Sequence, residues 1–285
     1  MRLLVYLHVY YHDQVPWFMD KLRHVTGVEW DLLVTWVAPN PATEALVRAC
    51  KPDARFLQVE NVGYDIWPFI VALRSIDMDA YEFILKLHTK NCSAPGNRIN
   101  GLHLRGFRWR NLLVDALLGS EEQFRHVWQC MTSDPKAGLA CNAALLCTLS
   151  VGLPEDTEPL FKEMERIGLH TDDLRFCGGT MFLARTAPLC FLRDLDLSPD
   201  SFSGPPLSHT VGSLAHVYER IVTFCITAQG YELVPVRSHP AVLWKVRIHR
   251  LLTPVLSWFF ALERRGPMRE KYLVILGIGI RLKGR

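Results

Sequence analysis

The first ninety residues alternate between short apolar runs and helical patterns, and this alternation limits the fold more than any other feature of the chain. Apolar runs of strand length occupy residues 3–9, 32–37, 56–59 and 83–87, and helical patterns occupy residues 15–25, 44–50 and 65–73. Strands that are separated by helices of this length pair in parallel through right-handed crossovers. The sequence therefore predicts an α/β protein with a Rossmann-type, mostly parallel sheet and flanking helices.

Several classes of protein are excluded by motifs that the sequence lacks. Gly-x-Gly-x-x-Gly does not follow the first predicted strand and Gly-x-x-x-x-Gly-Lys occurs nowhere, which argues against dinucleotide and P-loop chemistry. The eight cysteines include no Cys-x-x-Cys pair, so a zinc ribbon is not expected. The formal net charge is only +3, which gives no reason to expect a nucleic acid partner.

The sequence predicts neither a membrane span nor a secretory leader. No apolar run reaches the roughly 18 residues that a spanning helix needs. Tyr6 and His8 interrupt the apolar start of the chain, which a signal peptide would not tolerate. Because the cysteines mostly lie in the apolar contexts of small buried residues, we expect a reducing cytoplasm.

The rest of the chain is less periodic. Asp13 is placed to cap the first helix. A mobile loop is predicted at residues 91–101 and a second breaker-rich loop at 201–206. Helices are predicted at residues 107–118, 121–131 and 209–227, and another inner strand at 178–184.

Polar residues gather where the predicted strands end, and open α/β sheets bind ligands at this edge. Asn61, Gly63, Tyr64 and Asp65 follow the third strand, His88, Thr89 and Lys90 end the fourth, and Arg105, Arg108 and Arg110 begin the next helix. Taken alone, Asp65 is favoured as a helix cap over a ligand contact. The residues at the end of the fourth strand fit either a diphosphate site or a strand end that is exposed to solvent. The arginines fit either a phosphate clamp or a helix start that is exposed to solvent.

Five ordered motifs resemble the rhamnan synthesis protein F family of bacterial glycosyltransferases. They are Asn-x-Gly-Tyr-Asp-Ile-x-Pro-Phe at residues 61–69, Leu-Lys-Leu-His-Thr-Lys at 85–90, a Trp-Arg helix start at 109–110, Gly-x-Met-Phe-x-Ala-Arg at 179–185 and Ala-His-x-x-Glu-Arg at 215–220. The likeness runs from about residue 6 to residue 220. It implies a GT-A-like fold, a nucleotide-diphosphate sugar donor and a role in cell-surface polysaccharide assembly.

The resemblance also implies a donor site at the strand-end edge. The residues that we assign to it are Tyr6, His8, Asn61, Gly63, Tyr64, Asp65, His88, Thr89, Lys90, Arg108 and Arg110. In GT-A enzymes the fourth strand ends in Asp-x-Asp, which holds a divalent metal on the diphosphate, whereas His-Thr-Lys stands here. We therefore expect no metal ligands at this strand end and expect Lys90, with His88 and with Arg108 or Arg110, to supply the positive charge. The alternative is Mg²⁺ or Mn²⁺ bound elsewhere, for instance through Asp65.

Sugar transfer with inversion also needs a base, and we assign Glu219, His216 and Lys90 as catalytic residues. Glu219 and His216 are three residues apart and face one side of the predicted late helix. The alternative is a Glu219–Arg220 or Glu219–His216 network that only braces the fold, and Asp172 and Asp173 are further candidates for the base. The acceptor is assigned to Gly178, Gly179, Thr180 and Asp173, although glycine in a strand is as often a packing device.

The last forty residues differ in composition from the rest. From residue 245 onward the chain has ten Lys or Arg and two Glu, with an apolar helical pattern at residues 243–262 and a second apolar run at 272–280. We divide the chain into a catalytic domain at 1–240 and an amphipathic helical tail at 241–285. The tail is expected to lie on an anionic membrane surface at the inner face of the cell membrane, or to pack against the domain or a partner subunit.

These residues and the resemblance predict a glycosyltransferase. It would move rhamnose or a related deoxyhexose from a nucleotide-diphosphate donor to a growing cell-surface polysaccharide or lipid-linked glycan. The alternative is a non-catalytic sugar-binding or scaffold subunit of a polysaccharide assembly complex, for which the missing Asp-x-Asp is the best argument.

Overall fold

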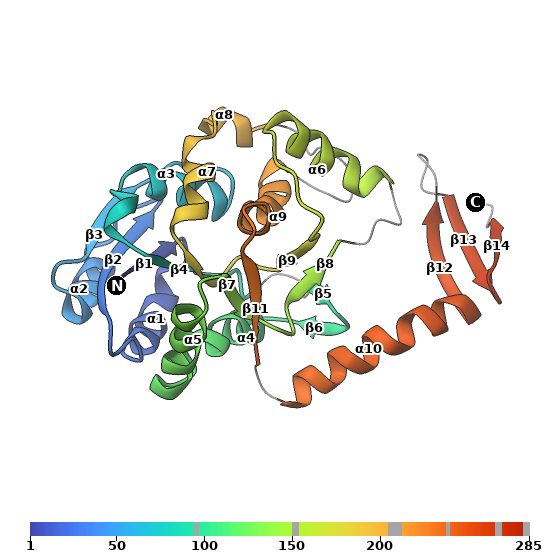
Figure 1. Cartoon of the computed structure of the whole chain (residues 1–285), viewed down its shortest axis with the longest axis horizontal. Coiled ribbons are helices and arrows are strands. Elements are labelled where there is room, and N and C mark those ends of the chain that lie inside the picture. Colours follow the sequence, from blue (N-terminus) through green and yellow to red (C-terminus); the bar gives the residue numbers. More distant parts are fainter. Residues whose placement is uncertain (94–96, 150–153, 205–212, 238–239, 266–269, 282–285) are drawn as a thin grey trace.

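The computed structural model describes residues 1–93, 97–149, 154–204, 213–237, 240–265 and 270–281, and its centre is a seven-stranded sheet (Figure 1). In spatial order the strands are β11 (Glu232–Val236), β7 (Ala137–Asn142), β10 (Phe182–Arg185), β4 (Phe83–His88), β1 (Arg2–Val9), β2 (Glu29–Trp36) and β3 (Arg55–Gln58). The four strands β1 to β4 pair in parallel, β10 is antiparallel to both of its neighbours, and β11 is parallel to β7. The predicted α/β class with a mostly parallel sheet is confirmed.

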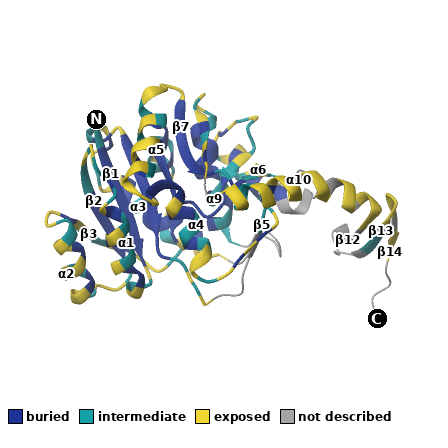
Figure 2. Ribbon diagram, turned by 90° about the horizontal axis from the view of Figure 1, so that it is seen from below, coloured by how far each residue is buried: buried dark blue, intermediate teal, exposed yellow. Residues whose placement is uncertain are grey.

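Helices cover both faces of this sheet and create two hydrophobic cores. One core is closed by α1 (Val15–Leu22), α2 (Pro41–Cys50), α4 (Phe107–Leu118) and α5 (Glu121–Ser133). The other is closed by α3 (Ile66–Arg74), α6 (Pro154–Arg166), α7 (Cys190–Asp194), α8 (Pro199–Phe202) and α9 (Leu214–Thr227). Short 3₁₀ turns are η1 (His12–Gln14), η2 (Met78–Ala80) and η3 (Ala187–Leu189). The inner strands are consequently buried on both faces (Figure 2).

Two short antiparallel strand pairs lie beside the main sheet, the hairpin of β5 (Asn97–Ile99) with β6 (Leu102–Leu104) and the pair of β8 (Leu146–Thr148) with β9 (Arg175–Cys177), which α6 separates along the chain. The first corrects the prediction of a loop at residues 91–101, of which 94–96 lie outside the described residues. Asn100 and Gly101 both have positive φ, 48° and 75°, as the tight turn of a two-residue hairpin requires. The buried Leu102 and Leu104 then fix the second strand against the core.

Other boundaries also differ from the predictions. Asp13 lies within η1, and the residue that precedes α1 is Gln14, which makes no side-chain cap. The inner strand predicted from residue 178 begins at Phe182, because a turn occupies the glycine-rich positions before it. The loop predicted at 201–206 begins inside α8, and its residues 205–206 are not described. Similarly, α9 begins at Leu214, and positions 209–212 of the predicted helix are not described.

The tail is a helix followed by a small sheet. The helix α10 (Pro240–Phe259) ends before residue 262, and β12 (Phe260–Arg265), β13 (Glu270–Ile275) and β14 (Ile278–Arg281) form an antiparallel sheet after it. The second apolar run is therefore two strands, joined at Leu276 and Gly277, whose φ angles are 52° and 77°. Figure 1 shows α10 leading away from the main sheet. No helix within the described residues has the length and apolar content that crossing a membrane requires.

Candidate functional site

The order of the strands reverses between β1 and β4. From β1 the chain runs outward through β2 to β3, and α3 then returns it to β4 on the other side of β1. His8 and His88 are register partners at the ends of these two strands, and the Thr89 N–H donates to the His8 carbonyl oxygen at 3.0 Å. Open α/β sheets bind ligands beyond the carboxyl ends of the strands at such a point. This edge is therefore the candidate site.

Four buried side chains meet at this edge, and we call Asp65, Lys86, His88 and Thr180 the Asp65 cluster. Lys86 Nζ donates to Asp65 Oδ2 at 2.5 Å, to the Thr180 carbonyl oxygen at 3.0 Å and to Thr180 Oγ1 at 3.3 Å. Thr180 Oγ1 donates to Asp65 Oδ2 at 2.6 Å, and His88 Nδ1 lies 3.4 Å from Asp65 Oδ1. Because Lys86 is fully buried, its ammonium group depends on these acceptors in place of water.

Backbone strain is found on both sides of the cluster. Of the four non-glycine residues with positive φ in the described chain, Tyr64 at 54° directly precedes Asp65, and Thr180 at 49° belongs to the cluster. Such a conformation costs about 1–3 kcal/mol and persists where its surroundings impose it. At Thr180 it presents both the carbonyl oxygen and Oγ1 to Lys86. The strain is thus coupled to the buried charges, an arrangement that is typical of functional sites.

The charges of the cluster shift one another's pKa values. Burial alone would raise the pKa of the Asp65 carboxyl, but His88, Lys86 and Lys90 reverse this effect and hold that pKa well below its usual range. Burial lowers the pKa of His88 well below its usual value, although the charge of Asp65 opposes this shift. The His88 Nε2–H donates to the Gly179 carbonyl oxygen at 2.9 Å. The contact of His88 with Asp65 is attractive only when the ring takes up a second proton.

Lys90 and Glu219 lie close enough to the Asp65 cluster for their charges to interact with that of Asp65. Lys90 Nζ lies 4.0 Å from the centre of the Trp109 ring, and burial lowers the pKa of Lys90 while Asp65 and Glu219 oppose the shift. Burial, followed by the charge of Asp65, raises the pKa of Glu219, although Lys90 partly opposes this. A carboxyl with a raised pKa beside a cation is suited to accept and return a proton.

His216 shares the α9 face with Glu219 and also stabilises the start of that helix. Its Nδ1 lies 3.2 Å from Ser213 Oγ in a reciprocal cap, and its ring contacts the exposed Tyr64 ring edge-on at a centroid distance of 5.3 Å. His216 therefore links the start of α9 to the turn that carries Asp65. These contacts with Ser213 and Tyr64 differ from the Glu219 network weighed above, and the catalytic role of His216 stays a prediction.

Three of the residues that we assigned to the donor site are used internally. Tyr6 is fully buried and its hydroxyl lies 2.9 Å from Thr35 Oγ1, which is also 2.9 Å from His8 Nδ1. Burial lowers the pKa of His8 to about 4. Thr89 Oγ1 accepts hydrogen bonds from the backbone N–H groups of Tyr10 and Tyr11. These side chains hold the strand ends in place and offer little surface to a ligand.

The helix-capping interpretation of Asp65 is wrong, and the arginines have separate environments. Asp65 occupies the N-cap position of α3 without a side-chain capping bond, because its carboxylate is bonded to Lys86 and Thr180. Arg110 is buried with its guanidinium 3.7 Å from the centre of the Trp17 ring. Arg108 is exposed, as are Asn61 and Tyr64 on the preceding turn. The structure therefore leaves Arg108 accessible and encloses Arg110.

The residues assigned to the acceptor do not form one surface. A Cβ on Gly178 would lie 2.9 Å from Cys147 Sγ, and one on Gly179 would lie 3.0 Å from Leu113 Cδ1, so a side chain at either position would crowd its neighbours. Gly179 also has a φ of 93°, which disfavours any other residue. Asp173, just before β9, pairs with Arg175 at 2.6 Å. Only Thr180 belongs to the Asp65 cluster, and the acceptor assignment stays a prediction.

The donor set at this edge fits a divalent cation poorly. Hard cations take several oxygen ligands, usually carboxylates. The Asp65 carboxylate is already bonded to Lys86 and Thr180, and Lys90 brings a further positive charge. Within the described residues, no group of three or more His, Cys, Asp or Glu side chains is arranged to hold a metal ion. We therefore derive no chemical step through a metal.

Two residues of this site were missed from the sequence. Lys86 lies inside an apolar strand, and a charged residue at such a position signals a buried partner. Trp109 has a buried Nε1–H with no hydrogen-bond partner in the described chain, and it lies against Lys90 and the Gly179 turn. Nothing in the local sequence distinguishes this tryptophan from one in a core, because the turn it contacts is 70 residues later.

The family model described as rhamnan synthesis protein F matches residues 1–231. The chain belongs to this family. The resemblance that the sequence motifs indicated is confirmed. The protein WxcX of Xanthomonas campestris pv. campestris is 31% identical over 237 residues, which are 82% of this chain and 32% of WxcX. The chain thus spans about a third of the length of the curated relatives that it matches.

Three solved structures illustrate the matches to this chain, all at low sequence identity and with TM-scores below 0.5. S. aureus TarS (residues 1–349) is 12% identical, with 88% of this chain and 65% of that chain covered and a TM-score of 0.43. Glucosyl-3-phosphoglycerate synthase of M. tuberculosis is 12% identical, with 98% and 89% covered and a TM-score of 0.41. The mannosyltransferase PcManGT of Pyrobaculum calidifontis, solved with GDP-Man and Mn²⁺, is 14% identical, with 90% and 62% covered and a TM-score of 0.38.

Proposed function

We propose that this protein is a nucleotide-sugar glycosyltransferase whose donor diphosphate binds beyond the carboxyl ends of β1 and β4. The observation that carries the proposal is the Asp65 cluster, a strained and fully bonded set of charges at the point where the strand order reverses. Membership of the rhamnan synthesis protein F family supports the same class of reaction.

Lys90 is the group that we assign to the leaving diphosphate. When the sugar is transferred, negative charge grows on the diphosphate oxygens, and a cation positioned there in advance stabilises the transition state. Asp65 and Glu219 keep the Lys90 ammonium charged against the effect of burial, which lowers its pKa. The fully bonded Lys86 would serve to hold Asp65 and the Thr180 turn in place.

Glu219 is the group that we assign to the acceptor. Its raised pKa makes the carboxylate a better proton acceptor than a solvated glutamate, and it would take the proton of the attacking hydroxyl. His216 would position it from one turn earlier on α9. Removal of this proton completes an inverting transfer, in which the new glycosidic bond forms as the bond to the diphosphate breaks.

The finer assignments are part of the same proposal. The donor sugar is rhamnose or a related deoxyhexose, and the acceptor is a growing surface polysaccharide or lipid-linked glycan. Residues 1–240 form the catalytic domain. The tail from residue 241 contacts an anionic membrane surface, which the exposed apolar side chains of α10 support. We place the protein in the cytoplasm, peripheral to the inner face of the cell membrane.

The test is hydrolysis of nucleotide sugars by the purified chain, measured over a panel of UDP, GDP and dTDP sugars with and without a chelator. Lys90→Ala is expected to lower turnover by about 2–4 kcal/mol of transition-state stabilisation, and Lys136→Ala, which removes an exposed lysine, serves as the matched control. Turnover should persist in chelator. Activity that chelator abolishes and manganese or magnesium restores would refute the role of Lys90 as the charge at the diphosphate.

The alternative is a non-catalytic sugar-binding or scaffold subunit. The observation that favours it is that the Asp65 carboxylate, at the start of α3, is already bonded to Lys86 and Thr180, whereas a catalytic metal site would need several free carboxylates. Nucleotide-sugar binding by calorimetry without hydrolysis or transfer, for every donor in the panel, would support this alternative.

A further inference from the structure

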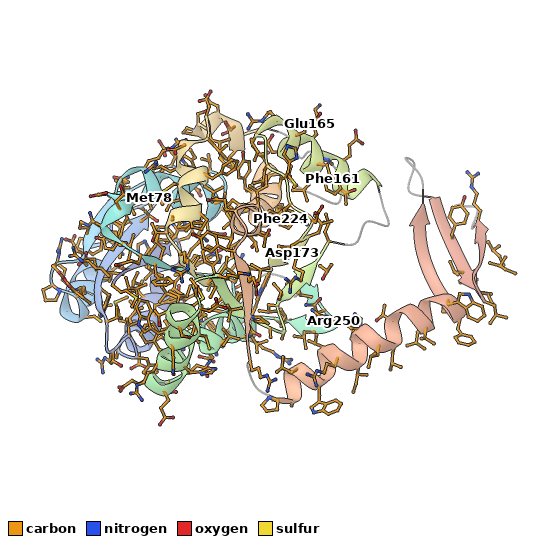
Figure 3. The ribbon with its side chains drawn as sticks, in the orientation of Figure 1. Met78, Phe161, Glu165, Asp173, Phe224 and Arg250 are labelled. Carbon is orange, nitrogen blue, oxygen red and sulfur yellow. The ribbon has the colours of Figure 1, made fainter. Side chains whose placement is uncertain are left out.

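A cavity of about 360 Å³ lies between the first turns of α10 and the β8–β9 strand pair, in the size range of small-molecule sites. Four arginines line it, Arg175 from β9, Arg237 just after β11, and Arg247 and Arg250 from α10. In Figure 3, Arg250 lies between α10 and the main body of the protein. No Asp or Glu is among the described residues that line the cavity. We call it the arginine pocket.

Two of the four guanidinium groups already have partners. Arg175 is paired with Asp173, and Arg250 Nη2 donates to the Leu146 carbonyl oxygen at 2.8 Å. Arg237 and Arg247 make neither a hydrogen bond nor an ion pair through their side chains within the described residues. Guanidinium forks bind phosphate oxygens in pairs, so an anion with several oxygens matches the two unpaired groups. The pocket is therefore suited to a phosphate ester or diphosphate.

An apolar surface adjoins the arginine pocket. Trp244, Ile248, Leu251 and Val255 recur at helical spacing along α10, and each is between 48% and 73% exposed. Trp244 also lines a smaller cavity together with Arg237 and Arg247, so the basic and apolar surfaces are continuous. In contrast, Val246 is only 3% exposed and anchors the helix to the body. A ligand at this place would meet arginines at one end and exposed apolar side chains at the other.

We propose that the arginine pocket binds the phosphate group of an anionic lipid while the exposed side of α10 lies in the membrane interface. The inference rests on the membrane contact proposed above and adds a defined headgroup site to it. A phosphate monoester or diphosphate is the chemistry that the arginines recognise. The adjoining apolar side chains favour a lipid as its source over free phosphate, because a soluble anion would leave Trp244 and its neighbours uncovered.

The experiment measures binding of the full chain to phosphatidylcholine vesicles that contain either phosphatidic acid or oleate at equal surface charge. A headgroup site predicts tighter binding to the phosphate lipid. Arg247→Gln is expected to weaken binding to the phosphatidic acid vesicles by about tenfold, because it deletes one charge-assisted contact. The preference for the phosphate lipid should then be lost. Lys245→Gln removes the same charge from an exposed position of α10 that lines neither cavity, and it should weaken binding to both vesicles equally.

Each outcome bears on the proposal. Equal binding to the two vesicles, or an equal loss of preference in Arg247→Gln and Lys245→Gln, would overturn the headgroup site while leaving the membrane contact standing. Calorimetry with inorganic pyrophosphate tests the soluble source, and binding of pyrophosphate without vesicle binding would overturn the lipid. Nucleotide-sugar hydrolysis by the same variants should be unchanged. Lipid preference in a chain that hydrolyses no donor would instead contradict the proposed enzyme and not the arginine pocket.

Discussion

Replacement of Asp65 by asparagine tests the Asp65 cluster directly. Lys86 is 0% exposed, and its ammonium group is 2.5 Å from the Asp65 carboxylate. Asp65→Asn preserves the size of the side chain but leaves that buried cation without its counter-charge, which typically costs about 3–5 kcal/mol. Natural domains are stable by about 5–15 kcal/mol, so we expect a large fall in the free energy of unfolding, measured by urea denaturation.

Two controls separate this effect from a general loss of charge. Asp53→Asn breaks the exposed pair with Lys51 and should leave the urea midpoint nearly unchanged. The double variant Asp65→Asn with Lys86→Met removes both buried charges and should recover most of the stability, because no unpaired ion remains. A single Asp65 variant as stable as the Asp53 variant would refute the reasoning, as would a double variant no more stable than Asp65→Asn alone.

Three further outcomes are expected. The pKa of His8 is about 4 in the folded chain and near 6.5 in the unfolded chain, so the unfolded state binds more protons between these two pH values. The free energy of unfolding should therefore fall by roughly 3 kcal/mol as the pH drops from 6.5 to 4. A urea midpoint that stays constant over this range would contradict the prediction. Gly179→Ala should destabilise by more than Gly168→Ala, since both have positive φ but only Gly179 is crowded, and equal melting temperatures would disprove crowding. A chain that ends at residue 239 should stay folded but no longer co-sediment with anionic vesicles. Unfolding of this truncated chain would instead show that the tail is part of the core.

The apolar runs predicted the first four strands, and the signal is strongest for β1 and β4, which are buried on both faces. Such strands need continuous apolar sequence, and β1 and β4 have it. Lys86 is the exception within β4, and its role was missed because the Thr180 atoms that bond it are 94 residues away along the chain. The apolar start of β12 could not be distinguished from a continuation of α10, because Phe260 and Leu262 suit either structure.

The sequence predicted which residues lie at the site better than it predicted their contacts. Motif residues such as Asp65, His88 and Lys90 do come together at one edge of the sheet. The sequence could not reveal that Asp65 would be bonded to Lys86 and not to the helix that follows it, since that choice depends on β10 lying beside β4. Nor could it separate the buried Arg110 from the exposed Arg108, because Trp17 encloses one of them from a different helix.

The position of β10 between β4 and β7 also matters while the protein is being made. Asp65 and Thr180 are 115 residues apart in the chain, and the edge of β4 that β10 covers stays open until β10 has left the ribosome. At about 5–20 residues per second, synthesis of the segment between these strands lasts on the order of 5–20 seconds. During that interval β4 presents unpaired backbone groups, which can pair with another chain. This edge of β4 is therefore open to pairing with another chain until β10 arrives.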